Sequence, residues 1–214
     1  MYAMRDTEAM WEQLRLERLA LADFLETLSD DEWNTPSLCE GWRVRDVVAH
    51  LGWTPVAPKP ELIRRFLAAR GDVDRMGYGW AREYGDRSPA ELVARTREIA
   101  GSRRYPIGVS KYEPLLDVLV HNSDIRRPLG KPRSTPEAAF RQVEHRVGFM
   151  ALMLGGRKRV KGLRLRASDI EWSYGSGPEV AASTEALLMI LSGRNVPAAE
   201  LSGPGAPTLV ARQG

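Results

Sequence analysis

Hydrophobic residues recur at three- and four-residue intervals along the first two-thirds of this chain. Over residues 7–28 this pattern is formed by Met10, Leu14, Leu21, Leu25 and Leu28. This spacing predicts an amphipathic helix. Prolines, glycines and N-cap residues bound the further predicted helices, which cover residues 42–51, 61–70, 89–103, 113–128 and 135–155. Residues 71–87 are rich in Gly, Tyr and Asp, and we interpret them as a long loop.

The pattern changes after residue 157. Apolar and basic residues alternate over 162–167, which is typical of a strand, and a second strand is predicted at 171–174. A third strand at 180–182 and a helix over 183–191 complete the C-terminal part. The chain is therefore predicted to be mostly α. A helical bundle covers residues 1–157, and a small α+β domain covers residues 158–214.

Composition narrows the class of protein. The 214 residues are 43% hydrophobic and 28% charged, with a net charge of +3, as expected for a globular protein. The arginines are scattered among acidic residues, which argues against nucleic acid as a partner. No apolar run reaches the roughly 18 residues that would span a membrane. The start of the chain, Met1–Asp6, lacks an apolar signal segment, and there is one cysteine, Cys39. We therefore expect a cytoplasmic protein.

Two of the three histidines lie in predicted helices beside acidic residues. Asp117, His121 and Asp124 are spaced i, i+4 and i+7, so they share one helical face. Taken alone, this stripe is interpreted most simply as a solvent-exposed face. Apolar neighbours border it, however, and His50 on another helix offers a second imidazole. Two imidazoles and a carboxylate are a ligand set for Zn²⁺, and Fe²⁺ and Ni²⁺ are alternatives.

Other candidate residues give weaker signals. His145 lies in a strongly polar stretch, so we interpret it as a surface histidine. Cys39 has no basic neighbour in the sequence to lower its pKa, and we interpret it as a small buried residue, with a catalytic thiol as the alternative. Arg194 follows an apolar helix, where an arginine either caps the helix or binds a substrate carboxylate.

Four stretches of this sequence resemble a known family. Residues 33–51, 121–130 and the C-terminal segments 167–172 and 191–194 resemble motifs of the DinB/YfiT-like superfamily. More narrowly, they are similar to the actinobacterial branch that includes mycothiol-dependent maleylpyruvate isomerase. The resemblance implies a DinB-like four-helix bundle with a small C-terminal domain.

The resemblance also implies a site. The metal ligands would be His50, Asp117 and His121, with Asp124 orienting His121. The branch usually carries glutamate where this chain has Asp117, whose side chain is one methylene shorter. Mycothiol would be the thiol cofactor. Arginines near the cleft would bind its anionic groups and those of the substrate; those we assign are Arg43, Arg126 and Arg194.

The function that follows is a metal-dependent enzyme that uses a low-molecular-weight thiol on a small electrophilic substrate. It would be a mycothiol-dependent S-transferase or a maleylpyruvate isomerase-like enzyme. Two alternatives stay open at this point: a non-enzymatic protein of the same fold that binds a metal or ligand, and a metal-dependent hydrolase. The sequence assigns no catalytic residue beyond the metal ligands, and it fits a monomer or a homodimer.

Overall fold

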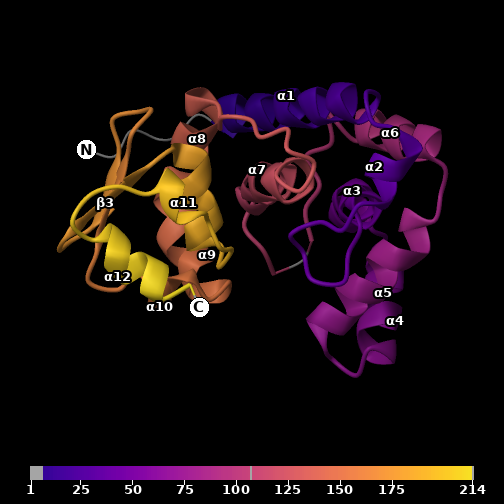
Figure 1. Ribbon diagram of the computed structural model, residues 1–214. Helices are drawn as coiled ribbons and strands as arrows, with labels where there is room; N and C mark the ends of the chain where they lie inside the picture. The colour runs from indigo at the N-terminus through magenta and orange to yellow at the C-terminus, as the bar shows by residue number, and fades with distance from the viewer. Residues whose placement is uncertain (1–6, 107, 214) are drawn as a thin grey trace. The chain divides into compact units, whose positions relative to one another are not determined.

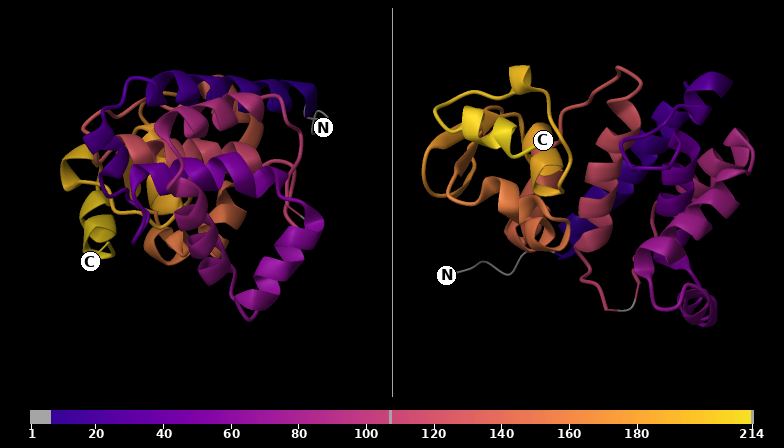
Figure 2. Two further views of the ribbon diagram at one scale, coloured as in Figure 1. Left: turned by 90° about the vertical axis from the view of Figure 1, so that its right-hand side faces the viewer. Right: turned by 60° about the horizontal axis from the view of Figure 1, so that its bottom comes forward.

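The computed structural model describes residues 7–106 and 108–213 (Figures 1 and 2). The chain divides into two compact units, residues 1–132 and 133–214. The N-terminal hexapeptide, on which the expectation about secretion rests, lies outside the described residues. Within the described ranges, no helix combines the length and the apolar character that crossing a membrane requires.

The first unit contains a bundle of four helices. These are α1 (Thr7–Leu25), α3 (Val44–Trp53), α6 (Pro89–Glu98) and α7 (Glu113–Arg126). Helices α1 and α3 each pack against both α6 and α7. Met10, Leu14, Leu21 and Leu25 of α1 are buried, whereas Leu28 lies beyond the end of the helix and is half-buried. Burial of these apolar stripes is the main driving force for such a bundle. The predicted mostly helical fold is confirmed.

The first unit contains further elements besides this bundle. They are α2 (Asp30–Asn34), the 3₁₀ turn η1 (Thr54–Val56), α4 (Lys59–Ala68) and α5 (Val73–Gly85). The loop expected over residues 71–87 is wrong, because this segment contains helix α5.

Helix α5 forms because tertiary packing outweighs its glycine content. The side chain of Asp72 caps the helix by accepting a hydrogen bond from the Arg75 backbone N–H. Trp80 is 2% exposed, and α5 packs along α3. Gly85 permits the close approach, because a Cβ there would lie 2.2 Å from Oδ1 of Asp46.

The second unit combines five helices with a three-stranded sheet within the described residues. The strands are β1 (Arg164–Ala167), β2 (Ser173–Gly175) and β3 (Glu179–Ala182), in the order β2-β1-β3. Strand β1 is antiparallel to β2 and parallel to β3. The helices are α8 (Glu137–Val143), α9 (Val147–Met153), α10 (Gly156–Val160), α11 (Thr184–Leu191) and α12 (Ala206–Ala211), and 3₁₀ turns occupy Glu144–Arg146 (η2) and Ala198–Glu200 (η3). The predicted small α+β unit is present.

Two expectations about this region differ from the structure. The single helix expected over 135–155 is wrong, because the 3₁₀ turn η2 separates α8 from α9. Apolar spacing does not reveal so short an interruption, since side chains at i and i+3 share a face in an α-helix and in a 3₁₀ turn alike. The unit boundary also lies near residue 132 rather than at the expected 157/158. Helices α9 and α10 pack against α11, and therefore belong with the sheet.

Candidate metal centre

The candidate site lies between α3 and α7 of the first unit. His50 is in the last turn of α3, and Asp117 and His121 are one turn apart on α7. Nε2 of His50 lies 3.5 Å from Oδ2 of Asp117, and Nε2 of His121 lies 3.3 Å from Oδ1 of the same carboxylate. One donor atom from each of these residues falls within 4.8 Å of the other two. The structure therefore brings together the three residues predicted to bind a metal.

Packing of the two helices fixes this convergence. Val44, Val47 and Val48 of α3 are fully buried, and His50, three residues after Val47, lies beside this apolar stripe. Pro114 occupies the first turn of α7, where its missing N–H leaves no bond unmade. Leu115, which follows, is also fully buried. The apolar positions thus set the rotation of each helix, and the polar positions meet as a consequence.

The side chain of Asp117 is long enough to contact both histidines of this site. The helices approach so closely that both oxygens of Asp117 face a histidine. The Asp117 side chain is 35% exposed, whereas those of His50 and His121 are 19% and 11% exposed. The donor set is therefore reached from the side of Asp117.

Hydrogen bonds orient both imidazoles. Nδ1 of His121 lies 2.8 Å from Oδ2 of Asp124, whose side chain is fully buried. Nδ1 of His50 lies 3.3 Å from the hydroxyl of Thr54. Nδ1 of each ring thus contacts a neighbouring side chain, and Nε2 points toward Asp117. This arrangement is typical of metal-binding histidines. The role expected for Asp124 matches this geometry. Thr54 was missed, although it stands four residues after His50.

The electrostatics show strong coupling between the acid and the imidazoles. Burial disfavours the charged form of His121, but Asp117 and the bonds with Asp117 and Asp124 raise its pKa well above the usual value. Burial likewise opposes charge on Asp117, yet the two histidines lower its pKa below the usual range. Nearby, burial lowers the pKa of Arg18 to about 10, against the attraction of Asp117. A metal cation that binds His121 would therefore have to displace a proton from its imidazole.

The donor set fits a divalent cation. Ligands of one zinc ion at about 2.0–2.2 Å lie no more than about 4.4 Å apart. The contacts of Asp117 with His50 and His121 lie within that limit. His50 and His121 pack edge to face with centroids 5.1 Å apart. Two imidazoles and a carboxylate leave coordination positions open, as in catalytic zinc sites.

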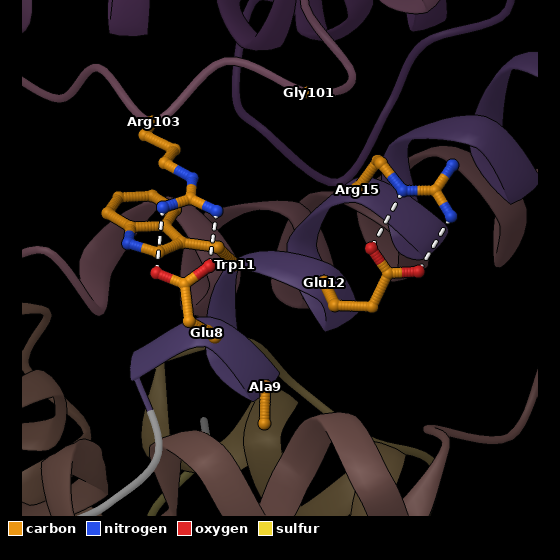
Figure 3. A pocket seen from close by; sticks show the side chains of 7 residues that line it. All are labelled: Glu8, Ala9, Trp11, Glu12, Arg15, Gly101 and Arg103. Atoms are coloured by element: carbon orange, nitrogen blue, oxygen red, sulfur yellow. Dashed lines mark hydrogen bonds and ion pairs between the residues drawn. The ribbon is translucent and has the colours of Figure 1, made fainter.

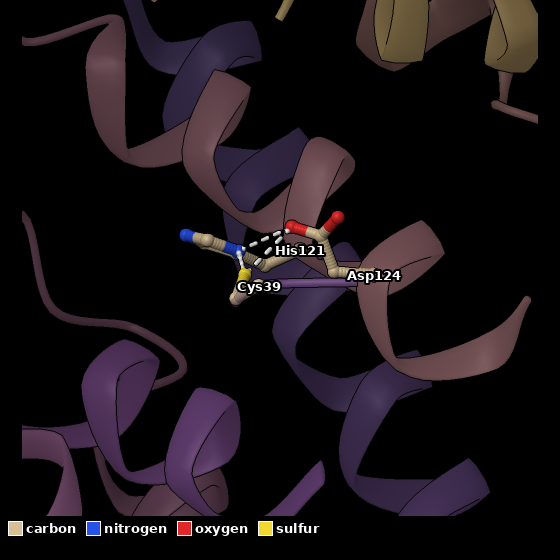
Figure 4. A group of neighbouring side chains, drawn as sticks. All are labelled: Cys39, His121 and Asp124. Carbon is tan, nitrogen blue, oxygen red and sulfur yellow. Dashed lines mark hydrogen bonds and ion pairs between the residues drawn. The ribbon is translucent and has the colours of Figure 1, made fainter. Parts of the chain in front are cut away.

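Two neighbours of the site were not predicted as members. Figure 4 shows Cys39 beside His121 and Asp124, with Sγ 3.2 Å from Oδ2 of Asp124 and 3.5 Å from Nδ1 of His121. The indole of Trp42 lies against both histidine rings, at centroid distances of 5.3 and 6.4 Å. Cys39 is half-buried rather than fully buried. The signal that could have found it is its position in the same loop as Trp42, immediately before α3.

The predicted arginines already have protein partners. Arg43 bonds through Nη2 to Asp46 and Asp86 at 2.8 Å each. Nε of Arg126 donates to Oδ1 of Asn122 at 2.6 Å. Their assignment to cofactor binding stays a prediction.

In the second unit, Nη1 of Arg194 donates to the carbonyl of Ser192 at 2.8 Å, just beyond α11. This bond agrees with the capping interpretation of Arg194. His145 is exposed, as expected for a surface histidine.

A hollow of about 370 Å³ in the first unit lies away from these donors (Figure 3). The charged groups around it pair with one another. Arg15 bonds to Glu12 at 2.6 and 2.8 Å, and Arg103 forms a two-pronged ion pair with Glu8. Because these charges are matched, the hollow offers no unbalanced group to attract a ligand.

Fold and site together define a DinB-like helical bundle with a small α+β unit and a two-histidine, one-carboxylate cluster. Residues 14–105 match the family model described as the mycothiol maleylpyruvate isomerase N-terminal domain. This segment includes His50 and ends before Asp117. The resemblance inferred from the motifs is confirmed.

Solved structures agree with this assignment. The chain is similar to the mycothiol-dependent maleylpyruvate isomerase and to a histidine-to-alanine mutant of it. Each comparison has a TM-score of 0.60 and 16% sequence identity, and covers 93% of both chains. Identity at this level shows the shared fold. No curated protein sequence matches the chain.

Proposed function

We propose that this protein is a divalent-metal-dependent enzyme that uses a low-molecular-weight thiol, mycothiol, on a small electrophilic substrate. The observation that carries the proposal is the convergence of His50, Asp117 and His121, with Asp117 accessible to solvent. A partly buried cluster of this composition is costly without a cation or protons to balance it. The similarity to a mycothiol-dependent isomerase supports the choice of thiol.

The residues of the site would have separate roles in binding the cation and in orienting its ligands. His50 and His121 would bind the cation through Nε2, while Thr54 and Asp124 contact Nδ1 of His50 and of His121, respectively. Asp117 contributes the negative charge. A divalent cation held there, with Zn²⁺ favoured over Fe²⁺ or Ni²⁺, supplies the positive charge that stabilises a thiolate at neutral pH.

Two outcomes are chemically open to the thiolate. The thiol S–H loses its proton, and the sulfur forms a bond to an electrophilic carbon such as that of an activated alkene. If the C–S bond persists and the adduct is protonated, the reaction is S-transfer. If the adduct rotates about the former double bond and the C–S bond breaks again, the thiol is regenerated and the reaction is a cis–trans isomerisation.

Metal analysis of untagged protein tests the site. We expect one divalent ion per chain, lost in His121→Ala and retained in His145→Ala, a matched change at an exposed histidine. Mycothiol is expected to raise the Tm of the metal-loaded wild type only. Absence of bound metal in the wild type would overturn the metal site.

Product analysis tests the reaction. With maleylpyruvate and other activated alkenes, we expect substrate loss that depends on mycothiol and disappears in His121→Ala. A stable S-adduct identifies a transferase, and an isomerised alkene with thiol recovered identifies an isomerase. Binding of mycothiol without turnover of any electrophile would favour a ligand-binding role. Thiol-independent cleavage of esters or amides would favour a hydrolase.

A further inference from the structure

The loop before α3 has a defined structure that presents one side chain to α7. The Ser37 backbone N–H donates to the carbonyl of Trp42 at 2.8 Å, and Trp42 N–H donates to the carbonyl of Cys39 at 3.0 Å. The hydroxyl of Ser37 accepts from Cys39 N–H at 3.1 Å. Gly41 closes the turn at φ = +76°, a value that disfavours residues with a side chain.

The loop also attaches directly to α7. The backbone N–H of Leu38 donates to the carbonyl of Asp124 at 3.1 Å. This bond places the next residue, Cys39, beside the Asp124 side chain. The thiol donates to Oδ2 of Asp124, the same oxygen that contacts Nδ1 of His121 at 2.8 Å (Figure 4). A single buried carboxylate oxygen thus joins the thiol to the imidazole.

We propose that Cys39 is a positioning residue that acts through Asp124 on the orientation of His121. The inference rests on the proposed metal site for its consequence, which is a higher affinity for the cation. A carboxylate that contacts a metal-binding histidine fixes the ring and raises its basicity. Hydrogen bonds to its oxygens restrict rotation of the buried Asp124 carboxylate about its side-chain bonds. The thiol, held by the Ser37–Trp42 turn, restricts that rotation.

A hydrogen-bond donor, rather than volume, is what this position supplies. Serine retains a donor of similar reach, whereas valine retains the approximate volume and removes the donor. The two variants therefore separate a polar role from a packing role. Sγ, Nδ1 of His121 and Oδ2 of Asp124 also lie close enough together to ligate an ion. The distance of 3.2 Å between Sγ and Oδ2 of Asp124 is that of a hydrogen bond from the thiol to the carboxylate.

The test compares Cys39→Ser and Cys39→Val by competition for Zn²⁺ with a chelating dye. We expect Cys39→Val to weaken Zn²⁺ binding about tenfold, the lower end of such effects, and Cys39→Ser to stay within about threefold. In an Asp124→Asn background, Cys39→Val should have no further effect, because the two residues act in series. Equal affinity of Cys39→Val and wild type, or a loss in Cys39→Ser alone, would overturn the proposal.

Two further measurements keep the inference separate from the proposed function. In metal-free protein, ¹⁵N NMR of the histidine side chains should show a shifted Nδ1 signal of His121 in Cys39→Val and a smaller change in Cys39→Ser. This holds even if the wild type binds no metal, and an unchanged signal would contradict the proposal. With Co²⁺ bound, a thiolate-to-cobalt absorption band that vanishes in Cys39→Ser would make Cys39 a ligand, which would also contradict it.

Discussion

Helices α7 and α11 are both buried, but their polar residues lie in different places. On α11 the buried polar residues Thr184, Glu185 and Ser192 lie at the two ends, and the residues between them are apolar. On α7 the polar residues Asp117 and His121 lie in the body of the helix, and Asp124 follows in its last turn.

The position along the helix decides what such groups can bond to. At the start of α11, the N–H and hydroxyl of Thr184 donate to Oδ1 of Asp169, and at its end the Ser192 hydroxyl donates to the carbonyl of Met189. These bonds complete helix ends, where backbone groups lack partners. In the body of α7 the backbone is already paired, so the side chains bond to one another and to α3. Buried polar residues within a helix body are therefore the stronger sign of a site.

The largest effect is expected from the apolar body of α11. Leu188 is 1% exposed, and Leu188→Ala should lower the free energy of unfolding by about 2–5 kcal/mol through lost burial and a cavity. Urea unfolding measures the loss. Zn²⁺ affinity measured on the folded fraction should stay as in the wild type. If Zn²⁺ affinity also fell, α11 would contribute to the metal site, and the difference in role between α7 and α11 that their polar residues indicate would be wrong.

The next effect concerns the charge at the centre of α7. Asp117→Asn keeps the size of the side chain but removes the anionic ligand, so Zn²⁺ affinity should fall about 100-fold, or about 2.7 kcal/mol. Dye competition measures the change. Asp23→Asn, at an exposed carboxylate paired with Arg97, serves as the matched control and should leave affinity unchanged. Similar affinities in the two variants would remove Asp117 from the site.

The smallest effect is a dependence of stability on pH in metal-free protein. The folded pKa of His121 is raised, so the folded state binds more protons than the unfolded state above the unfolded value of about 6.5. The stabilisation from this group is complete below that pH. It is lost as pH rises through the folded pKa, with a slope of at most about 1.4 kcal/mol per pH unit.

A His121→Gln variant isolates this contribution. The free energy of unfolding of the wild type minus that of the variant should decline from pH 6.5 upward. Asp117, whose folded pKa is lowered, works in the opposite direction. Its contribution is present above its unfolded pKa and is lost in acid, so the ion pair stabilises most between about pH 4 and 6.5. A flat difference between wild type and variant over the upper range would contradict the coupling.

Local patterns predicted most of the elements. The cores of α1, α3, α6, α7 and the C-terminal strands lie where periodicity and capping residues indicated. Helix α5 was missed because its glycines lower local helix propensity, while its formation depends on burial of Trp80 and the fit of Gly85 against Asp46. The boundary between the units was placed too late because contacts, not composition, assign α9 and α10 to the sheet.

The site was predictable where the residues share a helix. The spacing of Asp117, His121 and Asp124 guarantees a common face. The roles of Cys39 and Thr54 were not predictable in the same way, because a loop turn and a helix end bring them to the histidines. Arg43 shows the reverse case. Its position near His50 suggested a ligand-binding group, and the structure pairs it with Asp46 and Asp86.

The sequence by itself determined the helical periodicity, the alignment of three polar residues on one face and the motifs shared with the isomerase branch. These properties are local, since they depend on residues a few positions apart. Only the tertiary structure decided that His50 meets Asp117, that Asp117 is long enough to face both histidines, and that Cys39 bonds to Asp124. These contacts depend on how closely α3 and α7 approach, and packing of apolar residues throughout the unit sets that distance.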